Sequence, residues 1–175
     1  MPALPDPLHP AIVHFPIVLI LLGTVVAAAA IFWRKHFVPV WAAALLAVGA
    51  VGAWVAMETG ESDGDMVESM APPAAALLDA HEDWAERTLT AAAVAAIVAI
   101  ASVMLFKFPR LARAVAVATF LAAGAASYAV YETGHRGGAL VFRHGTGINV
   151  AAANEGGPTL APLQKGAVHK DLDDD

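Results

Sequence analysis

The chain has 175 residues, of which 58% are hydrophobic and only 15% are charged. Average soluble domains have about 25% charged residues, so this composition excludes an ordinary soluble globule, and it excludes a disordered chain as well. The absence of cysteine rules out disulfides, thiolate metal sites, cysteine nucleophiles and covalently attached c-type haem. The formal net charge is -6 and no basic stretch occurs, so we expect no nucleic-acid partner.

Four long apolar runs follow one another along the chain. Each has 18 to 21 residues without a Lys, Arg, Asp or Glu, and they cover 15–33, 37–57, 89–106 and 114–131. Helices of this length extend about 27 to 32 Å, and the hydrocarbon core of a bilayer is about 30 Å thick. Because unpaired backbone amides are not tolerated in lipid, the runs predict an all-α fold, a bundle of four transmembrane helices.

The charges between the runs predict the orientation. The short connections 34–36 and 107–113 hold five of the ten Lys and Arg residues and none of the sixteen Asp and Glu residues. The positive-inside rule places both connections in the cytoplasm, with both termini outside. In a signal peptide the cations precede the apolar stretch, whereas here they follow it, so we expect the first helix to be retained.

The rest of the chain divides at about residue 148. We assign 1–148 to the transmembrane domain and interpret 149–175, which is rich in Gly, Pro and Ala and ends in aspartates, as a disordered extracytoplasmic tail. Within the long outer segment 58–88, residues 74–87 have helical composition and are expected to continue into the third span.

Two helix ends resemble each other. Residues 54–67 read WVAMETGESDGDMV and residues 128–141 read YAVYETGHRGGALV, so Glu-Thr-Gly and a later glycine recur at one spacing. With the two basic connections, this echo predicts a duplicated helical hairpin, whose shared site would lie near the outer face. The alternative is a chance likeness between two ordinary glycine caps.

Five of the seven histidines fall on the predicted outer side: His9, His14, His81, His135 and His144. An imidazole near the bilayer boundary is costly unless it is paired or binds a metal, so these residues are functional candidates. His14 directly precedes the first run and is the leading one; the alternative is an interfacial ring bonded to a carbonyl. His81 would lie about 12 Å outside the core on a continuous helix, a height that also suits a solvated turn.

The segment 137–148 contains paired glycines followed by Leu140, Val141 and Phe142. Glycines let the chain turn and approach a flat partner closely, so we expect a lid over an outward-facing pocket. The alternative is an amphipathic loop that lies on the lipid headgroups.

These features resemble a known family. The opening His-Pro and Val-His-Phe-Pro-Ile within 9–17, the four runs, a histidine ahead of the third run, and Gly-Gly-x-Leu-Val-Phe-x-His-Gly at 137–145 are similar to a family of small bacterial four-helix membrane proteins, domain of unknown function 2231. The resemblance covers about residues 9–148 and implies a b-type haem held by histidines. The positions that match are His14, His81 and His144.

Some relatives in that family are fused to Rieske-type iron–sulfur domains, which implies redox work. We expect no fused redox domain here, and the acidic stretch 63–68 is not a hallmark of the family. The identity of an electron partner therefore stays open.

We expect an electron carrier in which His14 and His81 bind haem b near the outer face, with His144 or His135 as the substitute ligand. Electrons would pass between a membrane quinone or cytochrome and an extracytoplasmic partner. An enzyme is less expected, because the sequence contains no Ser-His-Asp order, paired intramembrane carboxylates or phosphate-binding loop.

Two other classes stay open. Met57, Met66 and Met70 lie at or in the outer segment, and thioethers with imidazoles suit copper, so a copper- or zinc-handling protein is one alternative. The other is a non-redox assembly subunit, which packs its small-residue faces in a homo-oligomer or a membrane complex.

Overall fold

The structure, a computed structural model, describes residues 8–33, 35–64 and 72–145. It contains five helices in these ranges and no strand: α1 (His9–Ile12), α2 (His14–Phe32), α3 (Phe37–Gly64), α4 (Pro72–Met104) and α5 (Pro109–His144). The predicted all-α class is therefore confirmed. The predicted tail lies outside the described residues.

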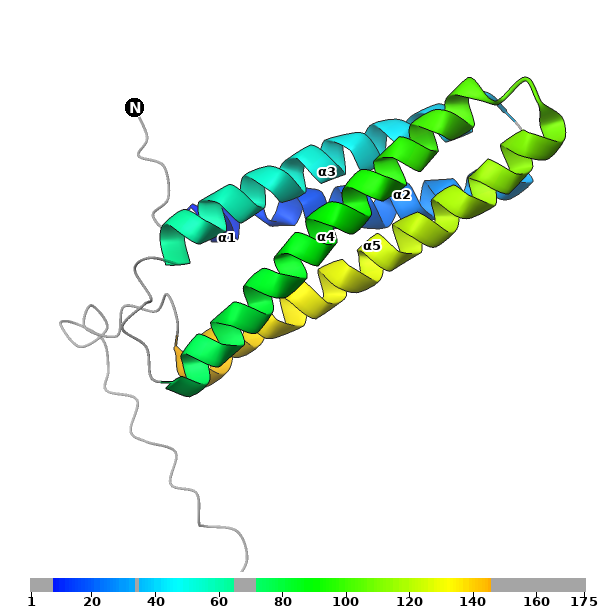
Figure 1. Cartoon of the computed structure of the whole chain (residues 1–175). Coiled ribbons are helices and arrows are strands. Elements are labelled where there is room, and N and C mark those ends of the chain that lie inside the picture. Colours follow the sequence, from blue (N-terminus) through cyan, green and yellow to red (C-terminus); the bar gives the residue numbers. More distant parts are fainter. Residues whose placement is uncertain (1–7, 34, 65–71, 146–175) are drawn as a thin grey trace, which may run out of the picture.

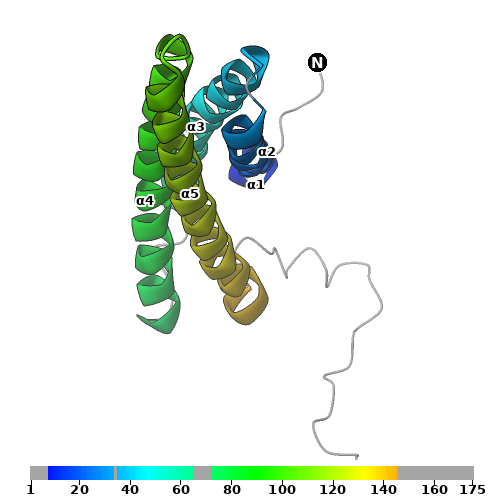
Figure 2. The same ribbon diagram turned by 90° about the vertical axis from the view of Figure 1, so that its right-hand side faces the viewer.

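Four stretches of the described chain are long and apolar enough to cross a membrane, as predicted: His9–Phe32, Phe37–Glu61, Pro73–Met104 and Pro109–His144. The first combines α1 and α2. The helices extend past the apolar runs, and Figures 1 and 2 show α4 and α5 continuing beyond the ends of α1 and α3. Residues 74–87 thus continue into the third span, as expected.

The break between α1 and α2 has a clear cause in the sequence. Pro16 has no amide hydrogen and cannot bond the carbonyl of Ile12 one turn earlier, and its ring crowds that carbonyl. The helix is interrupted at Val13, and the amide of Ile17 reaches the carbonyl of Val13 at 3.4 Å. α1 and α2 are therefore separate helices, although Val13 between them keeps right-handed helical angles (φ −57°, ψ −26°).

The bundle consists of two helical hairpins, α2 with α3 and α4 with α5. The most extensive contact is between α4 and α5, and α2 also packs on α5 while α3 packs on α4 (Figure 1). A hydroxyl cluster joins the hairpins inside the membrane. Thr24 of α2 lies 2.8 Å from the hydroxyl of Ser127 and donates to the carbonyl of Ala123, 3.1 Å away, both on α5.

The core is built almost wholly from alanine. Ile20 and Leu46 are the largest side chains that are fully buried among the described residues. Two clusters make up the core around them, one of Ala43, Leu46, Ala95, Ala96, Ala99 and Ala123, the other of Ile20, Ala92, Ala126 and Val130. Large apolar side chains are instead exposed, as expected for helices whose outer surface contacts lipid.

The segment 137–148, expected as a lid, is helical as far as it is described. α5 continues through Gly137 and Gly138 to His144 and ends at Gly145, whose φ of 68° gives a left-handed cap. Leu140 is buried, with 4% of its surface exposed, which holds this last part of the helix in place. The lid prediction was therefore wrong for 137–145.

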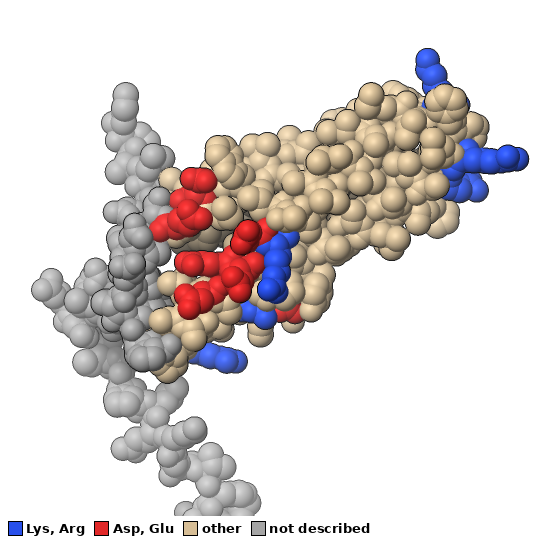
Figure 3. Space-filling model, viewed as in Figure 1, with Lys and Arg blue, Asp and Glu red and all other residues tan. Residues whose placement is uncertain are grey.

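The two ends of the bundle carry different charges (Figure 3). Acidic side chains gather where α3 ends and α4 begins, among them Glu58, Glu61, Asp79 and Glu82. Lys and Arg side chains occupy the opposite end, at the connections between α2 and α3 and between α4 and α5. We call these the acidic end and the basic end.

Close packing of α2 on α3 yields a first prediction. A Cβ atom on Gly23 would lie 2.8 Å from two side-chain carbons of Leu46, which is fully buried and has no room to move. We expect Gly23→Ala to lower the free energy of unfolding by about 1–3 kcal/mol, because the helices must separate. Unfolding in mild detergent, followed by circular dichroism, measures this loss.

Gly124→Ala is the matched control, because a Cβ atom there meets nothing within 4 Å. We expect it to be neutral or to stabilise the helix by up to about 1 kcal/mol. Equal losses in the two variants would contradict the packing that we describe for α2 and α3.

Candidate functional site: a histidine pair at the acidic end

Two histidines from different hairpins face each other at the acidic end. The ring centroids of His9, on α1, and His81, on α4, are 6.4 Å apart, and the ring planes are perpendicular. Both residues are half-buried. The pair lies outside the apolar runs, between the two hairpins at the acidic end of the bundle.

A backbone carbonyl of α3 fixes the ring of His9. Nδ1 lies 2.7 Å from the carbonyl oxygen of Ala56, and the hydroxyl of Thr59 is 3.5 Å from the same nitrogen. A carbonyl oxygen only accepts hydrogen bonds, so Nδ1 carries the proton and donates. In the neutral ring Nε2 then holds the lone pair, which is the form that binds a metal.

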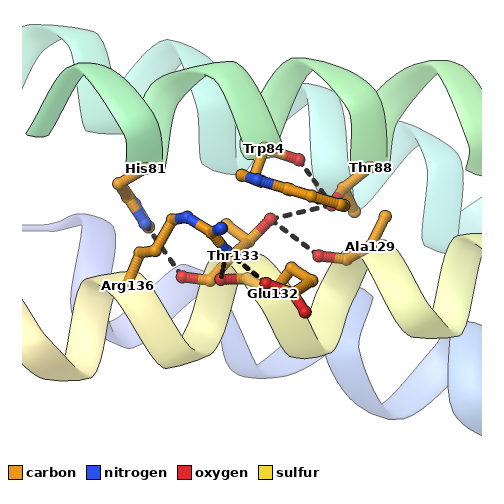
Figure 4. Close-up of polar contacts among 7 residues, drawn as sticks. All are labelled: His81, Trp84, Thr88, Ala129, Glu132, Thr133 and Arg136. Carbon is orange, nitrogen blue, oxygen red and sulfur yellow. Dashed lines mark hydrogen bonds and ion pairs between the residues drawn. The ribbon is translucent and has the colours of Figure 1, made fainter. Parts of the chain in front are cut away.

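A carbonyl of α5 fixes the ring of His81 in the same manner. Nδ1 lies 3.0 Å from the carbonyl oxygen of Thr133 (Figure 4). The hydroxyl of Thr133 is itself held, 2.9 Å from the hydroxyl of Thr88 on α4 and 2.9 Å from the carbonyl of Ala129. These bonds set the rotation of α5 against α4, and so the position of the carbonyl that His81 uses.

Each ring is seated above a glycine. A Cβ atom on Gly60 would lie 2.9 Å from Cε1 of His9, and one on Gly137 would lie 3.0 Å from Cε1 of His81. In both helices the glycine comes four residues after the carbonyl, Ala56 to Gly60 and Thr133 to Gly137. Residue i+4 is directly above carbonyl i on a helix, so a Cβ atom there would force the ring to shift away from the helix.

The repeated Glu-Thr-Gly sequence predicts the position of this contact between ring and glycine only approximately. It aligns Gly60 with Gly134, whereas the second ring is seated on Gly137, one helical turn further along. Both hairpins therefore make the same contact between ring and glycine, but at positions that differ by one helical turn relative to the Glu-Thr-Gly sequence.

The hairpins separate beside the pair. Ser127 faces α2 within the membrane, and Gly134 lies two turns later on the same face of α5. A Cβ atom on Gly134 would nevertheless meet nothing within 4 Å. α5 and the first hairpin therefore diverge toward the acidic end, as Figure 1 shows.

An aromatic and cationic cluster supports α4 against α5 next to His81. The guanidinium groups of Arg87 and Arg136 lie 4.8 and 4.9 Å from the ring centre of Trp84, and Tyr128 meets this ring edge-on at 5.8 Å. Arg136 also forms an ion pair with Glu132, one turn away (Figure 4). The cluster has the composition of a membrane-interface anchor.

The predicted site residues lie in different places. His81 belongs to the pair, but His14 is exposed on α2. It follows His9 by five residues, which turns it about 140° away around a helix. His135 is exposed and stacks on Tyr131 at 6.1 Å, and His144 is exposed at the end of α5. The structure thus brings His81 together with His9 and with none of the other three.

Sequence reasoning did not identify His9 as the partner of His81, and it did not identify Gly137 as the residue against which the His81 ring lies. The usable signal was a glycine in the outer extension of each hairpin's second helix, since a ring can approach helix backbone only there. For the copper alternative, Met66 and Met70 lie outside the described residues. In the described part of the chain, no group of three or more His, Cys, Asp or Glu residues is placed to hold a metal ion.

A family model described as "Predicted membrane protein (DUF2231)" matches residues 5–150. The chain belongs to this family. The match confirms the resemblance and spans all four helical crossings, the two histidines and both glycine seats. No curated protein and no solved structure matches the chain. This DUF2231 member is therefore an integral membrane protein, and any activity must be argued from its own geometry.

The carbonyl contacts predict the tautomers of the two rings. In protein labelled with ¹⁵N-histidine, we expect His9 and His81 to carry the proton on Nδ1 when they are neutral, because each Nδ1 donates to a carbonyl. Long-range ¹H–¹⁵N spectra measure the tautomer. His9→Gln and His81→Gln should each remove one Nδ1–H signal, whereas His14→Gln should remove neither. A proton on Nε2 in both rings would contradict the contacts.

Proposed function

We propose that this protein binds one haem b between His9 and His81 and passes electrons at the acidic end of the bundle. One observation carries the proposal: two imidazoles from separate hairpins face each other with both Nδ1 atoms engaged by carbonyls. In the neutral rings these bonds place the lone pair on Nε2, the atom through which an imidazole binds a metal.

The separation of the rings fits a shared metal. A metal–nitrogen bond to imidazole is about 2 Å long, and a ring centre lies about 1 Å behind its nitrogen, so two rings on opposite sides of one metal have centroids about 6 Å apart. The observed 6.4 Å agrees with this value. Perpendicular ring planes are compatible with such a pair, since both planes can contain the axis through the metal.

The number of ligands favours haem over a bare ion. Structural zinc takes four protein ligands, and catalytic zinc takes three, whereas the described residues supply two imidazoles here. A porphyrin brings four nitrogens of its own, so two axial histidines complete the coordination. The copper and zinc alternative lacks this support.

The surroundings supply orientation. Gly60 and Gly137 let each ring lie against helix backbone, and a Cβ atom on Gly134 would meet nothing within 4 Å. The carbonyls of Ala56 and Thr133 fix ring rotation, and a hydrogen bond from Nδ1 makes Nε2 more basic. When bound, haem supplies one-electron chemistry.

The charge pattern supports an outward placement of this site. Basic connections at the opposite end favour the cytoplasmic side, so the histidine pair would lie at the extracytoplasmic surface of the inner membrane, with both termini outside. From there the protein would carry electrons between a membrane quinone or cytochrome and a partner outside the cell membrane. A homo-oligomer or a larger membrane complex is compatible with the exposed apolar faces.

Removing either ligand tests the proposal. Protein purified from haem-sufficient cells should show a sharp α band in the reduced-minus-oxidised spectrum. His9→Ala and His81→Ala should each lose this band, or convert it to a high-spin spectrum, because one axial ligand is gone. His14→Ala is the matched control and should keep it. A colourless wild-type protein that is folded by circular dichroism, even after haem is added, would refute haem binding.

Substitution of the glycine that contacts the His81 ring offers a second test, which leaves both histidines in place. Gly137→Ala should push the His81 ring away from the carbonyl of Thr133 and weaken haem affinity by about 10- to 100-fold, as lost outer-shell contacts do at metal sites. Gly138→Ala is the neighbouring control, because a Cβ atom there meets nothing within 4 Å. Haem titration measures both. Equal affinities in the two variants would mean that the glycine seat does not position the ligand.

A further inference from the structure

Arg136 brings a positive charge next to one half of the histidine pair. It directly precedes Gly137, against which the His81 ring lies, and it follows Thr133, whose carbonyl holds that ring, by three residues. Figure 4 shows the Arg136 side chain running from beside His81 toward the ring of Trp84. The charge of Arg136 lies within electrostatic range of the His81 ring.

Contacts with Glu132 and Trp84 keep the Arg136 side chain in place. Its Nη1 donates to the backbone carbonyl of Glu132, 3.0 Å away, and forms an ion pair with the carboxylate of the same residue. The guanidinium group also lies 4.9 Å from the ring centre of Trp84. Because a planar guanidinium makes all these contacts in one orientation, the charge is held at one position beside the pair.

Water reaches this charge only in part. The exposed fraction is 24% for the Arg136 side chain and 17% for the Glu132 side chain. A charge that is mostly removed from water is screened less by solvent and ions than an exposed one. Arg87 stacks on the same Trp84 ring at 4.8 Å, but it is exposed. The two arginines therefore share the contact with Trp84 and differ in their screening.

A fixed cation beside an axial ligand acts on one-electron chemistry in a definite direction. An oxidised haem iron carries one more positive charge than a reduced one, so a nearby cation raises the free energy of the oxidised form more. The cation therefore favours the reduced form and raises the midpoint potential. The Glu132 carboxylate opposes this effect, but Figure 4 shows it on the side of the Arg136 guanidinium that faces away from His81. The positive end of the ion pair is thus nearer to the ring.

We propose that Arg136 raises the midpoint potential of the site by placing a fixed, weakly screened positive charge beside His81. This inference rests on the proposed haem site and deepens it, because it names the residue that favours the reduced state. Arg136 does not bind the iron and acts through its charge alone. A raised potential makes the histidine pair a better acceptor for an electron donor in the membrane.

Redox titration of the full-length, haem-loaded protein in detergent tests this role. We expect Arg136→Gln to keep the α band and to lower the ratio of reduced to oxidised protein at a fixed potential by about 3- to 10-fold, a fall in midpoint potential of about 30 to 60 mV. Arg136→Lys should retain most of the wild-type potential, because the charge stays. Arg87→Gln is the matched control and should change the ratio by less than about twofold, since Arg87 is exposed.

Two further measurements separate the charge of Arg136 from an indirect change in shape. The titrations are repeated at low and at high salt, where the effect of Arg136→Gln should persist, because salt screens exposed charges more than buried ones. In haem-free protein labelled with ¹⁵N-histidine, Arg136→Gln should keep the Nδ1–H signal of His81. That signal shows that the ring still donates to the carbonyl of Thr133. Circular dichroism confirms that each variant is folded.

The outcomes that overturn this inference are distinct from those that overturn the haem site. A colourless wild-type protein would refute both. A wild type with its α band and an unchanged or raised potential in Arg136→Gln would refute the role of Arg136 and leave the haem site standing. Equal shifts in Arg136→Gln and Arg87→Gln would show that only the overall charge of this end matters. Loss of the His81 signal in Arg136→Gln would show that Arg136 holds the ring in place and does not act through its charge.

Discussion

The geometry of the acidic end depends on one interaction, a hydrogen bond from an imidazole to a helix carbonyl beside a glycine. A carbonyl inside a helix already accepts from the amide four residues later, and it has a second lone pair to offer. A glycine at that fourth residue lets a ring reach the carbonyl closely, since a Cβ atom at Gly60 or Gly137 would lie 2.9 or 3.0 Å from the ring and force it to shift. Because each hairpin uses this contact once, the two rings are held on separate rigid supports and face each other.

The membrane-spanning part of the bundle keeps these supports in register. Thr24 bonds Ser127 and the carbonyl of Ala123, and alanine clusters hold the four spans at close range. Toward the acidic end, a Cβ atom on Gly134 of α5 would meet nothing within 4 Å, while His9 and His81 still meet across the two hairpins. The same bundle thus combines a tightly joined middle with a looser end where the two rings meet.

The spans and the helical class were predictable, because an uncharged run of 18 residues or more in a short chain has few other uses. The partner of His81 was not. His14 directly precedes the first apolar run, whereas His9 lies five residues further from it. Closeness to the hydrocarbon core therefore favoured His14, which is not the ring that meets His81. The choice is settled by the rotation of about 140° between the two residues around a helix and by a carbonyl on α3 that no local pattern reveals. The glycines at 137 and 138 likewise suggested a turn, although burial of Leu140 keeps that segment helical.

The two halves of the pair are not mechanically equal. His81 lies within the long, continuous α4, and the bond between Thr88 and Thr133 fixes its seat from both helices. His9 belongs to a four-residue helix that Pro16 separates from α2, so its position depends mainly on the carbonyl of Ala56 and on contacts with α3. A displacement of α1 would therefore move one ring and leave the other in place.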